Sequence, residues 1–369
     1  MVEWKKIEDL GPYFGGLTGK TKDDFVDGNA KFITYMNVFA NPSLDLTTTG
    51  VVRINPGEKQ NKIQKGDILF TGSSETPEEA GMSCVVTEDL DEDVYMNSFC
   101  FGIRLFQPEQ YDLSYLKHLL RSNNVRTDIS KSASGVTRFN ISKARFGKIL
   151  IPIPSLSEQT QIASNLDTFT ASIANLKEQI TLRCKQYEHY RDRLLDHEMK
   201  EKVGKKLGDV CKIKRGVRVV KRDLEDSGDI PVFQNCLSPM GFYKCSNNTG
   251  HTFVIIGGAA GDIGYSEKPF WAADDCLCIS GNPVLIDKYV YIHLRKNQHY
   301  IKSQVRKAGV PRLSRSVIEN LSIPVPTLEE QSRIVSILDT FEASIANLEA
   351  QLKEREMQYE YYRNKLLTF

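Results

Sequence analysis

The chain contains one short motif twice. "IPIPSLSEQ" occupies residues 151–159 and "IPVPTLEEQ" residues 323–331, so the copies lie 172 residues apart in a chain of 369. The match continues downstream at the same offset, where "LDTFTASIANLKEQI" (166–180) meets "LDTFEASIANLEAQL" (338–352). A period this long indicates two copies of one domain plan, too few for a solenoid of short repeats.

Upstream of the motif the two copies agree only in places. "GVTRF" at Gly135 matches "GVPRL" at Gly309 at an offset of 174, and "KKIEDL" (5–10) matches "KKLGDV" (205–210) at an offset of 200. The first middle is therefore 26 residues longer than the second. We predict a globular domain over 1–150, a helical region over 151–200, a second domain over 201–322 and a second helical region over 323–369.

Both helical regions begin with a capping signal. Ser155 with Glu158, and Thr327 with Glu330, form Ser/Thr-x-x-Glu boxes just after a Pro-x-Pro that ends any earlier helix. Apolar residues then recur at three- and four-residue steps, which is typical of a coiled-coil seam. The predicted seam comprises Leu166, Phe169, Ile173, Leu176 and Ile180 in the first copy and Leu338, Phe341, Ile345, Leu348 and Leu352 in the second.

The simplest partner for each helix is the other helix of the same chain. We therefore predict an α+β fold in which two mixed α/β domains are separated by two long antiparallel coiled-coil helices, with a pseudo-two-fold internal repeat. Parallel pairing, or pairing between chains, stays open. Strand-like runs in the middles include "FITYMNVF", "GDILFTG" and "FCFGIRLF" in the first and "TFVIIGG" and "DCLCIS" in the second.

Composition narrows the class of protein. The chain is 40% hydrophobic, has a net charge of +1, and carries neither an apolar run of membrane-spanning length nor a signal-peptide pattern at its start. We therefore expect a cytoplasmic protein without membrane contact. Its eight cysteines form no Cys-x-x-Cys pair and its histidines show no ligand spacing, so we expect reduced thiols and no metal site.

Catalytic motifs are incomplete. "NPSL" (41–44) and "NPVL" (282–285) both miss the Asn/Asp-Pro-Pro-Tyr/Phe motif of amino-methylating DNA methyltransferases. "GGLTGKT" (15–21) lacks the first glycine of a phosphate loop, and "GGAAGDIG" (257–264) lacks dinucleotide-binding spacing. Glycine turns or bulges are the better interpretation of both, and no catalytic residue is predicted.

Basic residues gather in two tracts. Residues 113–148 hold eight Lys or Arg and one acid, and residues 288–315 hold eight and none. Recurrence in two otherwise divergent domains favours phosphate binding over a solvated helix face. The phosphate candidates are Arg121, Arg126, Lys131, Arg138 and Lys143, then Arg295, Lys296, Arg306, Lys307, Arg312 and Arg315.

Reading a base sequence requires side chains that make paired hydrogen bonds to base edges. Such residues occur in the divergent loops, although polar residues there also cap turns. The candidates are Thr18, Lys20, Lys22, Tyr35, Asn37, Ser73 and Ser74 in the first domain, and Arg215, Arg218, Lys221, Gln234, Asn235 and Lys244 in the second.

The layout resembles one family over essentially the whole chain: the specificity subunit of type I restriction-modification systems. The resemblance rests on the repeated Gly-Val-x-Arg, the repeated Ile-Pro-x-Pro-x-Leu-x-Glu-Gln before a long helix, the "GDILFTG" strand and the Lys-Lys-Leu-Gly-Asp-Val restart. It implies two target recognition domains that each read half of a split double-stranded DNA site, held apart by helices that act as a ruler.

The resemblance also implies partners. Two methyltransferase subunits that carry S-adenosylmethionine would dock on the helical regions, and restriction subunits that use ATP and Mg²⁺ would join the full complex. This chain would bind no cofactor and would not itself be an enzyme. Two alternatives from other classes are a self-sufficient DNA methyltransferase or nuclease with degenerate motifs, and a coiled-coil scaffold with no DNA role.

Overall fold

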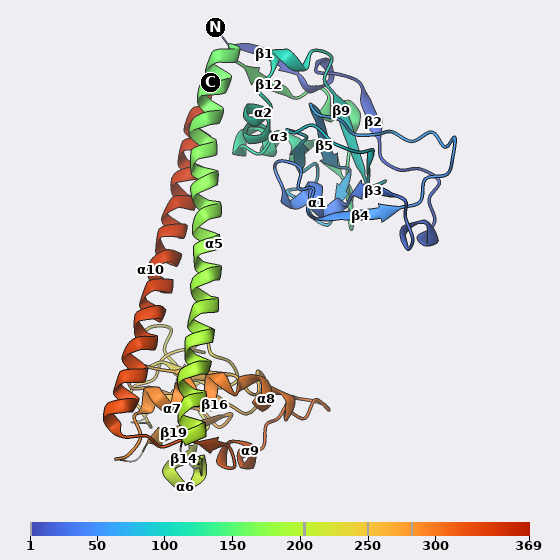
Figure 1. Ribbon diagram of the computed structural model, residues 1–369. Helices are drawn as coiled ribbons and strands as arrows, with labels where there is room; N and C mark the ends of the chain where they lie inside the picture. Colours follow the sequence, from blue (N-terminus) through green and yellow to red (C-terminus); the bar gives the residue numbers. More distant parts are fainter. Residues whose placement is uncertain (1, 202–203, 249–250, 282) are drawn as a thin grey trace. The chain divides into compact units, whose positions relative to one another are not determined.

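The computed structural model describes residues 2–201, 204–248, 251–281 and 283–369 (Figure 1). The chain forms two compact units, one made of Met1–Leu176 with Gln351–Phe369 and the other of Lys177–Ala350. Each unit thus combines one globular domain with the beginning of one long helix and the end of the other.

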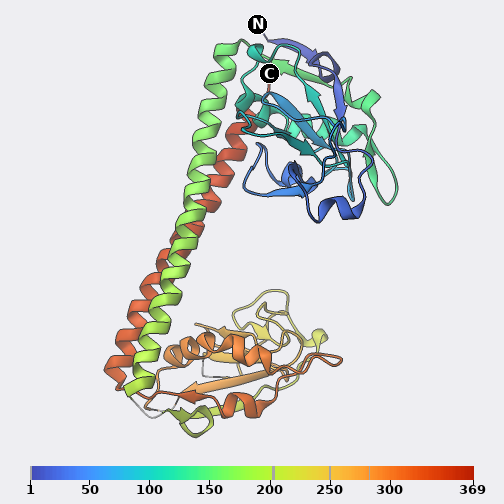
Figure 2. The same cartoon turned by 45° about the vertical axis from the view of Figure 1, so that its right-hand side comes forward.

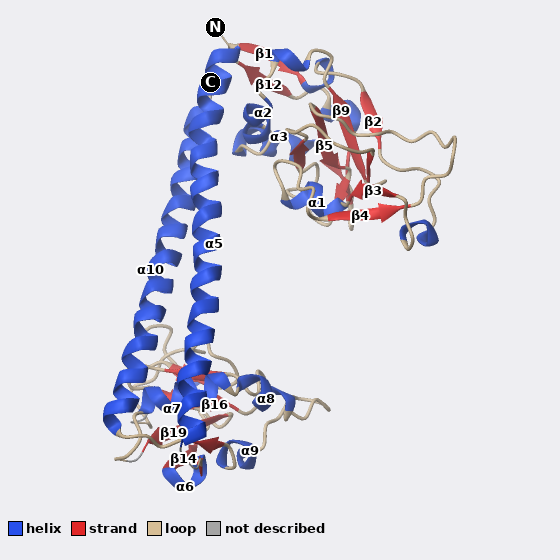
Figure 3. Ribbon diagram, in the orientation of Figure 1, coloured by secondary structure: helices blue, strands red, loops and turns tan. Residues whose placement is uncertain are grey.

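The first domain contains a central antiparallel sheet with strand order β2-β9-β5-β7, of which Figure 3 labels β2, β9 and β5. A second sheet has the order β4-β3-β8, and a third the order β10-β11-β6. The strands are β1 (Glu3–Lys6), β2 (Tyr13–Gly15), β3 (Ala30–Ile33), β4 (Thr49–Val52), β5 (Asp67–Thr71), β6 (Ser73–Ser74), β7 (Ser83–Val85), β8 (Val94–Met96), β9 (Cys100–Arg104), β10 (Ala133–Ser134), β11 (Phe139–Ile141) and β12 (Leu150–Ile153). The helices are α1 (Tyr35–Ala40), α2 (Leu113–Leu119), α3 (Asn123–Ser132) and α4 (Lys143–Phe146), with short 3-10 turns η1 (Ile7–Asp9), η2 (Lys22–Phe25) and η3 (Pro108–Gln110).

Strand β5 shows how the layers are built. Its alternating side chains point to opposite faces, so Ile68 and Phe70 join the core beneath α2 and α3, whereas Leu69 joins the core beneath β3 and β8. All three are fully buried. The "GDILFTG" run is therefore a strand, as predicted, and it lies inside the sheet, between β9 and β7.

The second domain repeats this plan with a sheet of order β14-β19-β16-β17. Its strands are β13 (Lys205–Lys206), β14 (Cys211–Arg215), β15 (Val232–Phe233), β16 (Thr252–Ile255), β17 (Ile263–Tyr265), β18 (Trp271–Ala272), β19 (Cys276–Gly281) and β20 (Ser322–Ile323). Its helices are α6 (Leu207–Val210), α7 (Asp287–Lys296), α8 (Gln298–Ser303) and α9 (Arg315–Glu319), with the 3-10 turn η4 (Lys221–Asp223). Val254 of β16 faces the core that contains α7, while Phe253 and Ile255 face the opposite core.

One predicted strand is wrong. The run "FITYMNVF" is a strand only as far as Ile33, and α1 starts two residues later. The Thr34 side chain accepts a hydrogen bond from the backbone N–H of Asn37, and this cap begins the helix despite the β-branched and aromatic residues around it. The two glycine-rich segments are turns, as predicted, with Gly19 at φ +67 and Gly258 at φ +81.

The repeated motif joins each domain to a long helix. β12 pairs with β1, and β20 pairs with β13 in the same antiparallel manner. α5 (Leu156–Glu201) and α10 (Leu328–Leu366) then begin. The predicted capping box is present at α5, where Ser155 Oγ and Glu158 Oε2 lie 2.6 Å apart and the Ser155 N–H donates to the same carboxylate.

The glutamine that ends the motif is buried and hydrogen-bonded in both units. Gln159 is fully buried; its Oε1 accepts from the Asp112 N–H at 2.9 Å and its Nε2 donates to the Pro154 carbonyl at 2.9 Å. Gln331 repeats this arrangement with the Ile286 N–H at 2.8 Å and the Pro326 carbonyl at 3.0 Å. Each glutamine therefore fastens the first turns of a long helix to the residue that precedes α2 or α7.

In the first unit the beginning of α5 runs beside the end of α10 (Figure 2). Phe169 stacks on Tyr362 with ring centroids 5.3 Å apart, and the guanidinium of Arg355 lies 5.8 Å from the Phe169 ring. Leu367 is 3% exposed and belongs to the core that also holds Leu166. The end of the second helix thus completes the core of the first domain.

The second unit contains the matching set. Tyr190 stacks on Phe341 at 5.3 Å, with Arg183 5.7 Å from the same ring. Leu195, fully buried, lies in the core that holds Leu338. Because the end of one helix meets the beginning of the other in each unit, the helices pair antiparallel within one chain, as predicted.

Among the predicted seam residues, Leu166, Leu176 and Leu338 are buried and the remaining seven are half-buried. Leu166 and Leu338 do more than line the seam, because each lies within the core of a globular domain.

Candidate nucleic-acid interface

A hairpin formed by β10 and β11 displays the "GVTR" segment of the first unit. Ala133 pairs with Ile141 and Ser134 with Asn140, while β11 also pairs with β6. Gly135 has φ +156, and a Cβ there would lie 1.9 Å from the carbonyl oxygen of Arg138. The turn therefore requires glycine, and the next residue, Val136, is 91% exposed.

Arg138 projects from the base of this hairpin. Its Nε donates to Ser73 Oγ at 3.1 Å, and its guanidinium lies 5.2 Å from the ring of Phe99, which is 57% exposed. Beside it lies a concavity of about 430 Å³, lined by Tyr35, Met36, Phe39, Ser74, Glu75, Glu79, Thr137 and Arg138. The structure thus gathers three sequence-predicted residues, Tyr35, Ser74 and Arg138, around one surface depression.

The second unit builds the corresponding hairpin differently. Arg306 and Arg312 exchange backbone hydrogen bonds of 2.9 and 3.1 Å across the turn "KAGVP". Gly309 has φ +75 and Val310 is 62% exposed. The Leu313 N–H donates to the Ile256 carbonyl, which fastens the hairpin to the end of β16.

An ion pair with Asp275 holds Arg312 in place. A Cβ on Gly257 would lie 2.6 Å from both the Arg312 Nη1 and the Asp275 Oδ1, so this glycine leaves room for the pair. The first part of "GGAAGDIG" therefore supports an arginine. Nearby, Arg215 Nε donates to the Asp274 carbonyl at 2.6 Å, and the backbone carbonyl of Asn235 accepts from the Ala259 N–H at 2.9 Å.

Two phosphate candidates of the first tract are corrected by the structure. The Arg121 guanidinium donates to the backbone carbonyls of Ser83, Val38, Phe39 and Asn41, and burial lowers its pKa to about 10. Arg126 likewise donates to the carbonyls of Glu78, Ala80 and Gly81, and burial lowers its pKa to about 10. Both guanidinium groups are therefore engaged by backbone carbonyls and hold loops of the domain together.

Several base-reading candidates of the first domain are also structural. Asn37 is 3% exposed, and its amide donates to the carbonyls of Asp45 and Thr48. Ser73 and Ser74 are 5% and 8% exposed. Tyr35 remains half-exposed at the edge of the concavity, although its hydroxyl donates to the Ser73 carbonyl at 2.8 Å. In the sequence alone, polar residues that stabilise this fold look the same as polar residues that would contact bases.

Lys20 is occupied as well. Its ammonium forms a 2.6 Å ion pair with Glu58, and only 5% of its side chain is exposed. The hydrogen bond from Lys20 holds the pKa of Glu58 at about 2. Thr18 hydrogen-bonds Gln60 through its backbone N–H and carbonyl and is exposed, as is Lys22 at the start of η2.

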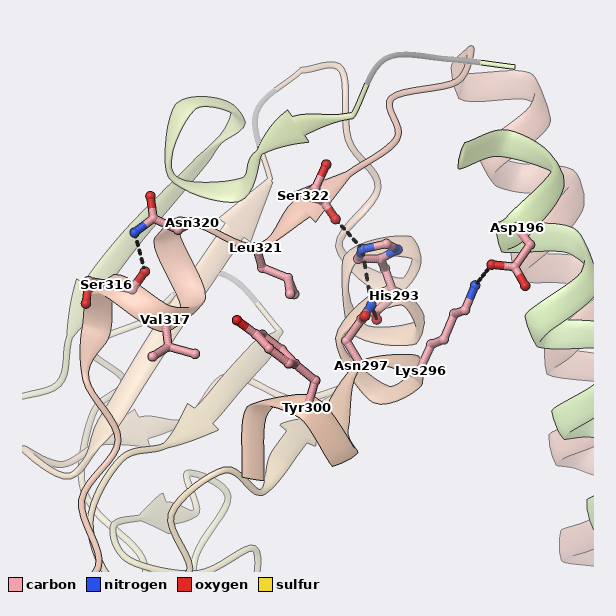
Figure 4. A pocket seen from close by; sticks show the side chains of 10 residues that line it. All are labelled: Asp196, His293, Lys296, Asn297, Tyr300, Ser316, Val317, Asn320, Leu321 and Ser322. Carbon is pink, nitrogen blue, oxygen red and sulfur yellow. Dashed lines mark hydrogen bonds and ion pairs between the residues drawn. The ribbon is translucent and has the colours of Figure 1, made fainter. Parts of the chain in front are cut away.

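In the second tract, Lys296 forms an ion pair with Asp196 near the end of α5, and 18% of its side chain is exposed (Figure 4). Both residues line a cavity of about 640 Å³ together with His293, whose Nε2 lies 2.8 Å from the Ser322 carbonyl. Lys296 therefore serves the attachment of α5. Arg295 donates to Gln298 at 2.8 Å and remains exposed.

The remaining candidates stay at the surface. Arg315 pairs with Glu319 at 2.6 Å, and Lys131 pairs with Asp128 at 2.9 Å. The side chains of Arg315 and Lys131 are both largely exposed. The Lys143 ammonium lies 5.3 Å from the Phe101 ring. Gln234 is half-buried, and the exposed candidates are Arg306, Lys307, Arg218, Lys221, Asn235 and Lys244.

Three features escaped the sequence prediction. Gln159 and Gln331 lie in the repeated motif, of which the sequence prediction uses only the Pro-x-Pro and the capping residues, although an amide at the same place in both copies is a usable signal. Phe99, beside Arg138, occupies a position that the sequence does not distinguish from a core aromatic.

Other sites were sought in the described ranges. Nowhere among those residues do three His, Cys, Asp or Glu gather so as to hold a metal ion. Within the same ranges, no helix is both long and apolar enough to span a bilayer.

The chain is similar to known proteins both in sequence and in structure. A family model described as the type I restriction modification DNA specificity domain matches residues 1–183 and again residues 199–355. A Haemophilus influenzae protein named as a type I restriction enzyme specificity subunit is 32% identical over 291 residues, covering 71% of this chain and 73% of that protein. The Escherichia coli EcoR124I/EcoR124II specificity subunit is 28% identical over 259 residues, which cover 60% of this chain and 63% of that protein.

Solved structures show the same fold. The S subunit of a type I restriction-modification system from M. genitalium aligns with a TM-score of 0.65 and 18% identity, over 100% of this chain and 96% of that one. A chain from a study of complex assembly and conformational transition of the type I system aligns with a TM-score of 0.59 and 17% identity, over 99% and 96%.

Proposed function

Because the chain belongs to the type I restriction-modification DNA specificity family, we propose that each of its two domains reads one half of a split DNA site. One observation carries the proposal. Each domain has a hairpin whose turn contains a glycine with positive φ and whose base carries an arginine held by a neighbouring side chain. The two hairpins occupy matching places in sequences that otherwise diverge. Two similar supports with different surroundings suit two different half-sites.

Within each domain we assign two kinds of contact. Exposed basic residues, led by Arg138 in the first unit and by Arg306, Lys307 and Arg312 in the second, would lie on phosphates and fix register. Base edges would be read from the surrounding divergent loops, including the depression beside Tyr35 and the loop at Asn235. Arg121, Arg126 and Lys296 take no part.

The long helices would set the distance between the half-sites and dock two methyltransferase subunits. Restriction subunits would join the full complex, S-adenosylmethionine and ATP with Mg²⁺ would bind to those partners, and each methyltransferase would flip and methylate its adenine. The matched seam, with Phe169 on Tyr362 and Tyr190 on Phe341, supports this by offering similar helical surfaces in both units. Family membership favours this role over a self-sufficient methyltransferase or nuclease.

The test is to assemble the chain with a methyltransferase subunit, map the methylated adenines and measure DNA affinity against salt. We expect a split recognition sequence, and we expect Arg138→Gln and Arg312→Gln each to reduce the steepness of the salt dependence by about one counterion. Lys65→Gln is the matched control, because Lys65 lies in the first domain and pairs with Asp89 at 2.7 Å.

Methyl transfer or cleavage by the purified chain alone would establish the enzyme alternative. An assembled complex that binds no DNA above background would establish the scaffold alternative. Unchanged salt dependence in both arginine variants would refute the phosphate assignment while leaving half-site reading intact.

A further inference from the structure

Two valines occupy the tips of the matching hairpins. Val136 is 91% exposed and Val310 is 62% exposed, and each follows the glycine that forms its turn. A single exposed valine is ordinary on a protein surface. The same apolar residue left uncovered at the same place in two domains with different loops is a feature that both domains retain.

The base of each hairpin carries an arginine that neighbouring side chains hold in place, and in the first unit Glu75 and Glu79 line the concavity beside that arginine. In the first unit Arg138 is held by Ser73 and lies over Phe99. In the second unit Arg312 is held by Asp275, and Arg306 and Lys307 are exposed beside the tip. Each valine is therefore an apolar point two residues from an arginine whose position does not depend on a ligand.

This arrangement is complementary to a groove of duplex DNA. The groove is bordered by phosphates, while its interior presents sugars and base edges against which small apolar side chains pack. The eight basic residues and absence of acids in 288–315 favour a polyanion over a protein surface around Val310.

We infer that the Val136 and Val310 tips enter a groove of the duplex and pack against its sugars, as a contact that is the same for every sequence. The inference rests on the proposed function and adds a second class of contact to it. If the two domains read different half-sites, a hairpin that is alike in both domains contributes little to the difference between their sequence preferences. The valine tips then contribute affinity, and the divergent loops contribute choice.

The test uses the chain assembled with its methyltransferase partner and two duplexes, one with the recognised sequence and one unrelated. Val136→Asp and Val310→Asp should each weaken binding about tenfold, because a carboxylate replaces an apolar contact near phosphates. The loss should be equal for both duplexes, so the ratio of their affinities and the methylated sequence stay unchanged. Val51→Asp is the control, since Val51 is 44% exposed on β4 and lies outside the hairpin.

A second variant places the segment of the second hairpin in the first domain, which changes only Thr137 and Phe139 and keeps the valine. Replacing "GVTRF" (135–139) with "GVPRL" should keep the methylated sequence and bring both affinities within about threefold of the parent, since the tip is sequence-independent.

Three outcomes would overturn the inference. Unchanged affinity in both aspartate variants means that the tips do not touch DNA. A loss confined to the recognised duplex, or a new methylated half-site after the exchange, means that the tips read bases. Loss of methyltransferase binding with intact DNA affinity means that the tips meet a protein. If the parent complex itself selects no sequence, it is the proposed function that fails.

Discussion

The two units solve one problem with different side chains. In the first, the hairpin arginine is held by a serine hydroxyl and an exposed phenylalanine ring; in the second, by a carboxylate that a missing Cβ makes reachable. The backbone pairing beneath both hairpins is similar, because β11 pairs with Ser73 and Ser74 of β6 and Arg312 pairs with Gly257. The backbone support of the hairpin is therefore the same in both units, while the side chains around it differ.

The junctions with the long helices diverge less. Gln159 and Gln331 make the same bonds to equivalent backbone groups. Beside them the ion pairs differ: Lys117 and His118 both meet Asp167 in the first unit, whereas Lys288 meets Asp339 and Glu342 in the second. Geometry is therefore held most closely where a domain meets its helix.

Removing the buried glutamines Gln159 and Gln331 should change stability the most. Gln159→Ala should lower the free energy of unfolding of the first unit by about 4 kcal/mol, and Gln331→Ala should do the same in the second, because each leaves a buried N–H and buried carbonyls unpaired. The chain's two tryptophans report the units separately, Trp4 in the first and Trp271 in the second, so Trp4→Phe and Trp271→Phe backgrounds followed by urea unfolding would measure each.

Gln161→Ala is the matched control, since Gln161 is exposed two residues further along α5, and should cost less than about 0.5 kcal/mol. A large cost in only one unit would show that the two junctions are similar in geometry but not in energy.

Sequence predicted the repeated architecture because its signals are local and periodic. The Pro-x-Pro, the capping residues and the three- and four-residue spacing specify helix starts and the apolar seam without reference to tertiary contacts. It failed at α1, where the Thr34 cap overrode strand-like composition. Antiparallel pairing was preferred from symmetry, and the Leu195 and Leu367 contacts with the domain cores confirm it.

The site was less predictable because charge does not show what it faces. Arg121 and Arg138 look alike in the sequence, but one donates to four backbone carbonyls inside the domain and the other stands on the surface. The carbonyls that Arg121 binds belong to segments distant from it in the sequence. These partners therefore become visible only in the folded domain. A hairpin tip, by contrast, could be inferred from the repeated glycine.

The second expected effect concerns two buried histidines. His293 is 2% exposed, and burial lowers its pKa to about 4; its Nε2 bonds the Ser322 carbonyl. His118 is 1% exposed and its pKa is also lowered by burial, but the Asp167 carboxylate, 2.8 Å away, opposes the shift. The unfolded chain binds a proton on histidine below about pH 6.5, whereas native His293 does so only near pH 4.

The free energy of unfolding of the second unit is therefore not reduced by His293 above about pH 6.5. As the pH falls from about 6.5 toward 4, protonation of this histidine in the unfolded chain lowers that free energy by about 3 kcal/mol in total. Fluorescence of Trp271 in the Trp4→Phe chain should show the second unit losing stability over that window more steeply than the first. His293→Gln should flatten the dependence, whereas His118→Gln should leave the second unit's profile as it was. Equal slopes in both units would contradict this assignment.

The smallest expected effect tests the seam, where the two units are most alike. Phe169 on Tyr362 and Tyr190 on Phe341 have the same centroid distance and an arginine beside each phenylalanine. Double-mutant cycles with leucine at each pair should give coupling energies of about 1 kcal/mol that agree between units within about 0.5 kcal/mol. Because the rings stack at ordinary van der Waals distances and remain partly exposed, neither pair should dominate its unit. A coupling present in one unit and absent in the other would mean that the helices present two different surfaces, and the proposed equivalence of two methyltransferase docking sites would have to be given up.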